Sequence, residues 1–374
     1  MGANCSPDSG VIMKIAYCIR KNWKVAHGGD VVQMVNTKAE IEKVYNVEIR
    51  IIDNVKDLNS FSPDIAHIFN MQTLEESSEY VQEAKLLGAK VVLSTIYWDM
   101  SHARFIDNFA RLGFFCNSEY YKRIYKIYKN SEVYMASIFG KPKSVTKNYE
   151  DKVRNFLQEF DWYLPNSEEE MLIINDTFGT NYKNYSVIPN SVDFNKFPYF
   201  SNKQRKGFIS AARIEPVKNQ LQLVDICRAS NWDLTLVGGV TPNNLRYLEA
   251  VKKHAIGSGR IKISAQNLAQ NELGHLFKTH ILASFRESPG LSSLEALSSG
   301  MNVVVCDSDY CPTDTYFKGL IDQHVFVCDP YSKKSIHKAM KAAYELDTPR
   351  TNVLLKFNWA NTGYETFKVY EKLV

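Results

Sequence analysis

The chain has 374 residues, of which 45% are hydrophobic, 12% aromatic and 23% charged, and its formal net charge is +4. This length favours two domains, since a single hydrophobic core rarely grows beyond about 250–300 residues. The aromatic content excludes an intrinsically disordered chain, and so small a net charge does not support a dedicated nucleic-acid-binding protein. No apolar run reaches the roughly 18 residues that a transmembrane helix requires.

The N-terminal residues 1–12 lack the basic and then apolar build of a signal peptide, so we expect a disordered leader or an expression remnant there. The seven cysteines are dispersed, and none belongs to a cluster with the spacing of zinc ligands. This pattern predicts reduced thiols in a cytoplasmic protein that needs no metal.

From residue 13 the chain alternates short apolar runs with helical patterns, which is typical of βαβ units and a parallel sheet. We predict strands over 14–19, 47–52, 65–69 and 90–95, with helices over 29–45 and 74–87. The runs 162–165 and 185–189 would complete this first sheet.

A second unit of the same kind follows the polar stretch 201–206. Strands are predicted over 207–212, 232–238, 260–264, 281–284 and 302–306, and helices over 219–229, 245–254, 271–279 and 291–299. The tail 332–374 is predicted to be helical. Two doubly wound α/β domains would therefore meet near residue 200, and ligands should bind at the carboxyl ends of the strands, in the cleft between the domains.

Residues 120–156 depart from this pattern, because they carry nine Lys and Arg against three acidic residues, with aromatic residues interleaved. Basic side chains beside interfacial aromatics suit the surface of an anionic bilayer. The alternative is an ordinary solvated helical face, on which the lysine stems lie along the surface and their charged ends reach water.

The run 281–300, ILASFRESPGLSSLEALSSG, holds the most informative helix start of the chain. Ser288 would be the N-cap and Pro289 the first helical residue, both of which are favoured there. The amides of Gly290 and Leu291 would then point out of a helix N-terminus, which is an anion site suited to a diphosphate.

Charged residues surround this helix start. Glu287 precedes the helix and Glu295 follows two turns in, so the two carboxylates could hold sugar hydroxyls around a phosphate. Arg213 and Lys218 follow a strand end five residues apart, where two cations would neutralise a departing diphosphate. Taken alone, these cations could equally be surface groups beside a loop.

Two consecutive glycines, Gly28 and Gly29, follow His27 after the first strand, and they would allow close backbone approach to a ligand. They do not form G-x-G-x-x-G, so the dinucleotide fingerprint is absent and a nicotinamide dehydrogenase is disfavoured.

Together these pieces resemble glycosyltransferase family 4, the retaining sugar-nucleotide enzymes of the GT-B fold. Glu287 and Glu295 match the family's Glu–seven residues–Glu spacing, and Arg213 with Lys218 matches its diphosphate clamp. The run VIPNSVD, which contains Asn190, is similar to the family's interdomain IPNGVD, and Gly28 and Gly29 match its N-terminal glycine loop. The resemblance covers roughly residues 13–374.

The resemblance implies a domain plan: an N-terminal acceptor-side domain over 13–195, a nucleotide-sugar-binding domain over 196–345, and C-terminal helices over 346–374 that cross back to the first domain. Two departures stand out. The family's Glu-Gly-Phe-Gly is replaced by Glu-Ser-Pro-Gly, and the family's Thr-x-His motif has Tyr97 in place of the histidine. The role of that histidine would pass to Tyr97, Asp99 or His102, unless these residues only pack at the sheet edge.

The implied activity is transfer of a hexosyl or N-acetylhexosaminyl group from a UDP or GDP sugar to a hydroxyl of a glycan, a lipid-linked sugar or a polysaccharide, with retained configuration and without a metal cofactor. Glu287 would hold sugar hydroxyls, Glu295 ribose hydroxyls and Asn190 the donor. Two alternatives stay open: a nucleotide-sugar epimerase of the same architecture, and a non-catalytic sugar-nucleotide-binding subunit of a transferase complex.

Overall fold

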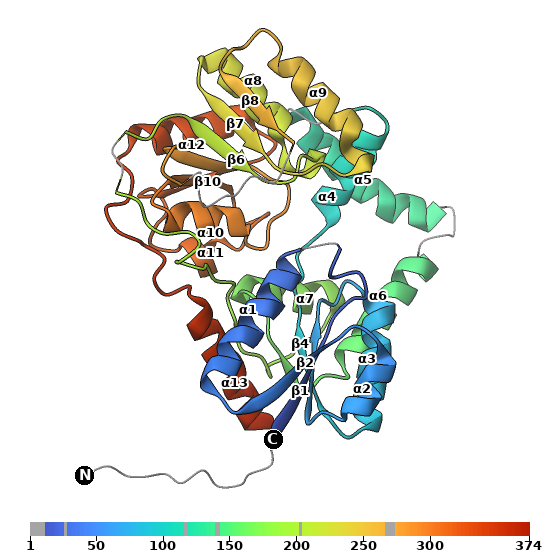
Figure 1. Cartoon of the computed structure of the whole chain (residues 1–374). Helices are drawn as coiled ribbons and strands as arrows, with labels where there is room; N and C mark the ends of the chain where they lie inside the picture. The colour runs from blue at the N-terminus through green and yellow to red at the C-terminus, as the bar shows by residue number, and fades with distance from the viewer. Residues whose placement is uncertain (1–11, 26–27, 116–118, 139–142, 202–203, 266–273) are drawn as a thin grey trace, which may run out of the picture.

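The computed structural model describes residues 12–25, 28–115, 119–138, 143–201, 204–265 and 274–374, without the side chains of 130–138 and 143–148. The described chain forms two parallel sheets, each with helices on its faces (Figure 1). This confirms the predicted fold class. The predicted leader, His27 and Lys141 lie outside the described residues.

The first sheet has the strand order β2-β1-β3-β4-β5. Its strands are β1 (Met13–Cys18), β2 (Val47–Ile52), β3 (Ile65–Phe69), β4 (Lys90–Ser94) and β5 (Trp162–Tyr163). Helices α1 (Gly29–Val44), α2 (Val55–Phe61), α3 (Leu74–Leu86), α6 (Lys143–Leu157) and α7 (Glu168–Phe178) accompany it. The strand predicted over 185–189 is wrong, since only the single bridge between Tyr163 and Tyr185 forms there.

The second sheet has the order β11-β10-β9-β6-β7-β8. Its strands are β6 (Phe208–Ala211), β7 (Leu234–Val237), β8 (Ile261–Ser264), β9 (Thr279–Leu282), β10 (Asn302–Cys306) and β11 (Val325–Cys328). Its helical elements are η1 (Pro216–Lys218), α8 (Gln220–Ser230), η2 (Pro242–Asn244), α9 (Leu245–Ala255), α10 (Leu291–Ser298), α11 (Thr313–Phe317) and α12 (Lys333–Glu345). Of the helix predicted over 271–279, residues 271–273 lie outside the description and the rest is a turn leading into β9.

Helices α4 (Ser101–Arg111) and α5 (Glu119–Ile138) follow the first domain in sequence but pack on the second. Phe105, Ile106 and Tyr125 are buried in one apolar cluster with Phe285 of the second domain. Lys122 of α5 forms an ion pair with Asp329, with 2.7 Å between Nζ and Oδ2. Helix α6 then returns to the first domain (Figure 1). The pair α4–α5 therefore links the two domains on one side of the cleft.

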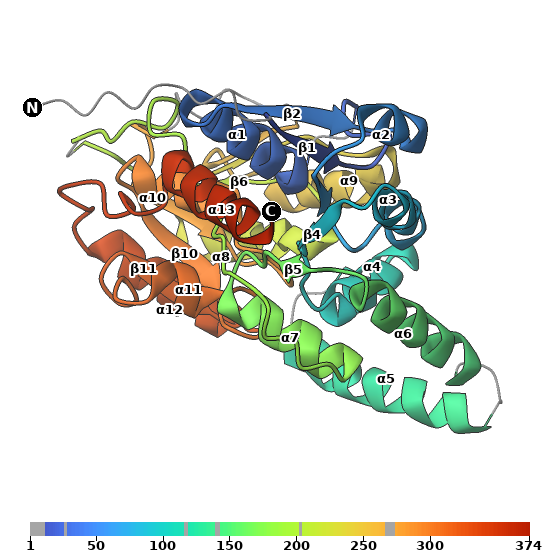
Figure 2. The same cartoon turned by 90° about the horizontal axis from the view of Figure 1, so that it is seen from below.

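The C-terminal helix α13 (Trp359–Leu373) crosses back to the first domain, as predicted, and lies along α1 (Figure 2). The Tyr370 hydroxyl is buried 3.1 Å from the Tyr17 hydroxyl and 2.6 Å from His67 Nδ1. A Cβ on Gly363 would lie 2.8 Å from Glu40 Cβ, so only glycine allows this close approach of α13 to α1.

Within the described residues, no helix is long and apolar enough to cross a membrane. The basic segment 120–156 forms most of α5 and α6, and Arg123, Lys126 and Lys129 of α5 are exposed.

Candidate active site

The loop between β9 and α10 carries the predicted anion site, with one change at its cap. Gly290 is the N-cap residue, with φ of 84°, and α10 begins at Leu291. A Cβ on Gly290 would lie 2.7 Å from Leu282 Cδ2, so the left-handed backbone and the lack of space both require glycine. The predictions of Ser288 as N-cap and Pro289 as first helical residue are wrong, because the left-handed Gly290 separates both residues from the helix.

Lys218 and Glu287 meet beside this helix start. Lys218 ends the short helix η1, and a hydrogen bond of 2.9 Å from the Phe285 amide to the Val217 carbonyl ties η1 to the loop of Glu287. Lys218 Nζ lies 2.6 Å from Glu287 Oε1, and the side chains are only 15% and 7% exposed. Two residues for which the sequence suggested separate roles are therefore partners in a nearly buried ion pair.

Arg213 has a more open position than Lys218. Its side chain is 66% exposed and forms an ion pair of 3.2 Å with Glu215. Nearby, Asp107 and Arg111 of α4 and Glu215 line a cavity of about 550 Å³ between α4 and the second domain. Burial raises the pKa of Asp107, and the negative charge of Glu215 adds to that effect. Arg213 is thus largely exposed and paired with Glu215, a residue that lines this cavity.

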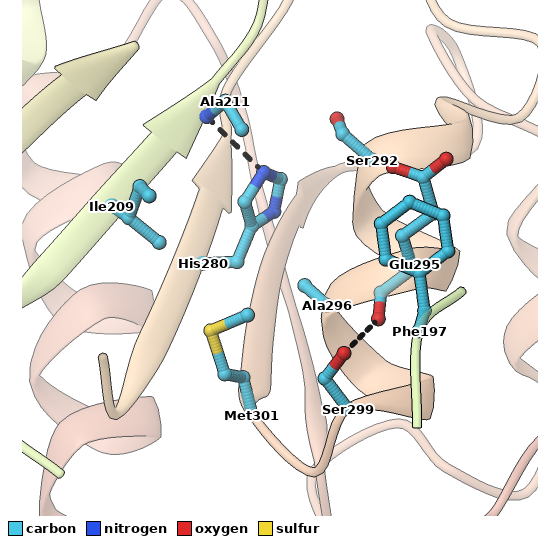
Figure 3. Close-up of a pocket in the computed structure, with 9 residues that line it drawn as sticks. All are labelled: Phe197, Ile209, Ala211, His280, Ser292, Glu295, Ala296, Ser299 and Met301. Atoms are coloured by element: carbon cyan, nitrogen blue, oxygen red, sulfur yellow. Dashed lines mark hydrogen bonds between the residues drawn. The ribbon is translucent and has the colours of Figure 1, made fainter. Parts of the chain in front are cut away.

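Glu295 lies on α10 and lines a small cavity of about 20 Å³ together with Phe197, His280 and Ser292 (Figure 3). Burial raises the pKa of Glu295 to about 7, against the opposing effect of Lys196. No described residue donates a hydrogen bond to its carboxylate. The neighbouring His280 accepts weakly from the Ala211 amide at 3.4 Å, and burial lowers its pKa to about 4, so its ring is neutral.

The two glycines of the first domain lie at the start of α1, with Gly28 as the N-cap residue. A Cβ on Gly29 would lie 3.9 Å from Leu291 Cδ1 of the second domain. The N-termini of α1 and α10 therefore approach each other across the cleft. Both carry the positive end of a helix dipole, so their meeting point favours an anion.

The residues that could replace the family histidine are held by other contacts. The Tyr97 ring packs against Phe178 of α7, with ring centres 5.6 Å apart. Asp99 accepts hydrogen bonds from the Ser101 amide at 2.8 Å and the Ser101 hydroxyl at 2.7 Å, at the start of α4. His102 Nδ1 lies 2.9 Å from the Tyr331 hydroxyl. These contacts favour the packing interpretation of the three residues over a direct role at Glu287.

Asn190 lies at the junction between the domains. Its backbone amide donates to the Tyr316 hydroxyl at 2.8 Å, and that hydroxyl donates to the Asn166 backbone carbonyl at 2.9 Å. The Oδ1 atom of Asn190 is buried without a described partner. These contacts fix the backbone at Asn190, where the chain passes from the first domain to the second.

Two charged residues beside the cleft were missed, the buried Glu170 and the partly buried Arg286. Glu170 accepts from the backbone amides of Tyr97 at 2.7 Å and Asn166 at 2.8 Å, and from the Thr95 hydroxyl. These bonds hold a chain turn in which Ile96 has a φ of +46°, a strained value for a β-branched residue. The second is Arg286, directly before Glu287. The only sequence signal for Arg286 was its place in the FRESPG run. For Glu170 there was a clearer one, because Ser167 and Glu170 have the spacing of a helix capping box.

Comparisons with known proteins agree with this architecture. Residues 191–354 match the family model described as glycosyl transferases group 1. A sucrose-phosphate synthase from Thermosynechococcus elongatus has a similar structure, with a TM-score of 0.68, 12% identity, and coverage of 96% of this chain and 99% of that one. The structure of HepE from Anabaena in complex with UDP and glucose is also similar. Its TM-score is 0.66 at 12% identity, and the match covers 96% of this chain and 100% of that one. No curated protein sequence matches significantly.

The lipopolysaccharide outer core galactosyltransferase WaaB is also similar, with a TM-score of 0.63, 12% identity, and coverage of 97% of this chain and 100% of that chain. Residues 191–354 of the second domain thus resemble group 1 glycosyl transferases, and the whole chain has the GT-B fold seen in these structures.

Proposed function

We propose that this protein is a retaining glycosyltransferase that moves a hexosyl or N-acetylhexosaminyl group from a nucleoside diphosphate sugar to a hydroxyl acceptor. The observation that carries the proposal is the meeting of the α1 and α10 N-termini beside the Lys218–Glu287 pair. That point combines two helix dipoles, a cation and a carboxylate, which are the groups needed to bind a diphosphate and an adjoining sugar. The similar HepE structures, one of them solved with UDP-glucose, support a nucleotide-sugar donor.

The positive groups would act on the leaving diphosphate. Lys218 has two further N–H donors beyond the one directed at Glu287, and the Arg213 side chain is 66% exposed. Together with the amides of α10, they would stabilise charge on the departing β-phosphate, so we expect transfer without a divalent metal. Glu287 would hold sugar hydroxyls near the anomeric carbon, and Glu295 would accept hydrogen bonds from the ribose.

The transfer would follow a front-face route. The bond between the anomeric carbon and the β-phosphate oxygen breaks, and a bond from that carbon to the acceptor oxygen forms on the same face. The acceptor's hydroxyl proton passes to an oxygen of the departing phosphate. Retention follows because both bonds lie on one face of the sugar.

We further propose that α5 and α6 dock the protein on anionic lipid, where a lipid-linked acceptor would be available. The exposed Arg123, Lys126 and Lys129 support this, as does the exposed ring of Tyr120. Lys122 contributes less, because Asp329 already neutralises it.

The test is incubation of the protein with a panel of UDP and GDP sugars, with and without acceptor glycans, while released nucleoside diphosphate is measured. We expect release with one donor class, which persists in EDTA. Nucleotide binding without release, under all acceptors, would favour the non-catalytic subunit. Interconversion of the sugar without transfer would favour the epimerase.

A further inference from the structure

Arg286 is a partly buried cation beside the cleft that the proposed function leaves unused. Its Nε atom is buried without a hydrogen-bond partner. Among the residues that the structure describes, no carboxylate pairs with its guanidinium, and no hydrogen bond to it is formed. Burial lowers the pKa of Arg286, but a guanidinium keeps its proton under any ordinary condition. The ligand-free protein therefore holds a guanidinium that no described residue engages in an ion pair or hydrogen bond, although the carboxylates of Glu287 and Glu170 are near enough to act on its charge.

The direction of this side chain follows from the loop that carries it. Phe285 packs inward, with its ring centre 4.7 Å from that of Tyr331, and Glu287 turns to Lys218. The ionisable groups that act on Arg286 are Glu287 and Arg213 of its own domain and Glu170 and Tyr97 of the first. Arg286 therefore lies between the two walls of the cleft, next to the carboxylate proposed to hold the transferred sugar.

Glu170 is the obvious candidate for a partner, but its carboxylate is already engaged. Oε1 accepts from the Thr95 hydroxyl and the Tyr97 amide, and Oε2 accepts from the Asn166 amide. Burial raises the pKa of Glu170 to about 7, so it carries a full negative charge only above neutral pH. It stabilises the strained turn at Ile96 and forms no ion pair with Arg286.

A partly buried arginine whose Nε is buried without a partner has its N–H donors free for an anionic ligand. The diphosphate already has Lys218, Arg213 and two helix N-termini. We infer that Arg286 binds an anionic group carried by the substrate beyond the diphosphate, namely a carboxylate or phosphate on the transferred sugar or on the acceptor. Its planar fork suits the paired oxygens of either group, which a lysine would not match. This inference rests on the proposed function, since it places the transferred sugar at Glu287.

The experiment compares wild type with Arg286→Gln and Arg286→Lys by calorimetric titration. In the donor arm, the ligands are UDP, UDP-glucose and UDP-glucuronate, with the GDP counterparts GDP and GDP-mannose. In the acceptor arm, nucleotide-saturated protein is titrated with glucose, glucuronate, glucose 6-phosphate and inorganic phosphate. The same sugars and phosphate are also titrated without nucleotide. The exposed Arg111→Gln serves as the matched control, because it removes a cleft-side arginine that is not buried.

We expect Arg286→Gln to weaken binding of at least one anionic ligand about tenfold or more, the size of a lost charge-assisted pair, while UDP and UDP-glucose bind as to wild type. Arg286→Lys should restore part of the affinity, and Arg111→Gln should change none. The donor arm or the acceptor arm then identifies which molecule carries the anion. The ligand-free Arg286→Gln protein should melt no lower than wild type, because the substitution removes no ion pair or hydrogen bond formed with the described residues.

Two results would overturn the inference. In one, Arg286→Gln weakens UDP as much as any anionic sugar, which would make Arg286 part of the diphosphate site. In the other, no anionic ligand prefers wild type to Arg286→Gln in either arm. Failure of the proposed function is seen separately, as wild-type protein that binds neither UDP nor GDP, because the titrations without nucleotide still read out Arg286.

Discussion

Lys218 Nζ and Glu287 Oε1 lie 2.6 Å apart in a position where both side chains are nearly buried. Each charged group can therefore be buried because the other neutralises it. A ligand that draws Lys218 toward its phosphate must also leave Glu287 with a new partner, and a sugar hydroxyl beside the anomeric carbon would be one. The pair couples the diphosphate side of the proposed site to its sugar side.

This pairing predicts that loss of Lys218 costs stability as well as activity. Lys218→Met leaves the Glu287 carboxylate buried and unpaired, and we expect a loss of about 3 kcal/mol in the free energy of unfolding. The double variant Lys218→Met/Glu287→Gln should recover part of that loss. Arg213→Gln, whose parent side chain is 66% exposed, should change stability by less than about 0.5 kcal/mol. Urea unfolding measures all three, and equal effects of Lys218→Met and Arg213→Gln would contradict the pairing.

Both cations should matter for transfer, whatever their effect on stability. Arg213→Gln or Lys218→Met should each lose about 2–4 kcal/mol of transition-state stabilisation, as the loss of one preorganised donor does. Single-turnover rates with saturating donor measure this directly. Near wild-type rates in both variants would remove these residues from the diphosphate clamp.

The two glutamates should separate chemistry from nucleotide binding. Glu287→Gln should lower turnover strongly while it changes affinity for free nucleoside diphosphate little, because the carboxylate acts as charge develops on the sugar. Glu295→Gln should weaken nucleotide binding, because an amide oxygen accepts ribose hydroxyls less strongly than a carboxylate. Calorimetry and turnover on the same preparations decide the matter; the reverse pattern would exchange the two roles.

Glu295 also predicts a pH dependence. Burial raises its pKa in the folded protein to about 7, above the value of about 4.5 for an unburied glutamate. The folded state therefore binds the proton more tightly, and the stability contributed by Glu295 is full below about pH 4.5 and is lost as the pH rises through 7. Nucleotide affinity should change in the opposite sense and strengthen from pH 6 to 8, as the carboxylate forms. In Glu295→Gln, both the stability and the nucleotide affinity should vary less with pH than they do in wild type. Identical pH profiles for the two proteins would argue against this role.

Membrane docking is tested with vesicles of anionic and neutral lipid. The triple variant Arg123→Gln/Lys126→Gln/Lys129→Gln should lose about 3 kcal/mol of binding to anionic vesicles, at about 1 kcal/mol for each cation. Lys122→Gln is the matched control and should lose less, because Asp329 neutralises Lys122 in the folded protein. Co-sedimentation at low and high salt measures the partition. Wild-type protein that binds neutral and anionic vesicles equally, or neither, would contradict the proposal.

The fold was predictable because most strands of the two sheets contain a short apolar run, as in β10 (Asn302–Cys306), whose bounds match the prediction. Parallel sheets covered on both faces give such runs. Helices with less regular patterns were harder: α7 and α11 went unpredicted although they form a contact between the domains, where Glu169 accepts from the Thr315 amide at 3.0 Å. That contact joins residues far apart in the chain, and no local pattern contains it.

The sequence predicted which residues belong to the site, but not which of them pair with each other. The spacing of Glu287 and Glu295 identifies two carboxylates near one helix, but the pairing of Glu287 with Lys218 depends on how two loops are tied together. The helix start was misplaced by two residues because Ser-Pro favours an N-cap locally, whereas Gly290 has the backbone that the loop requires. Arg286 was overlooked because its lack of a partner is a property of the packed cleft alone.

The central claim is that a diphosphate binds where the N-termini of α1 and α10 meet, and Gly29 tests it most directly. A Cβ at Gly29 would only touch Leu291 Cδ1 at 3.9 Å, an ordinary contact, so Gly29→Ala should fold and bind UDP or GDP within a few-fold of wild type. Gly29→Asp should fold equally well, since an acidic residue is favourable in the first turn of a helix. Its carboxylate should nevertheless repel the diphosphate and weaken the binding measured by calorimetry tenfold or more. If Gly29→Asp binds the nucleoside diphosphate as tightly as Gly29→Ala does, the diphosphate does not lie between these helices and the account is wrong.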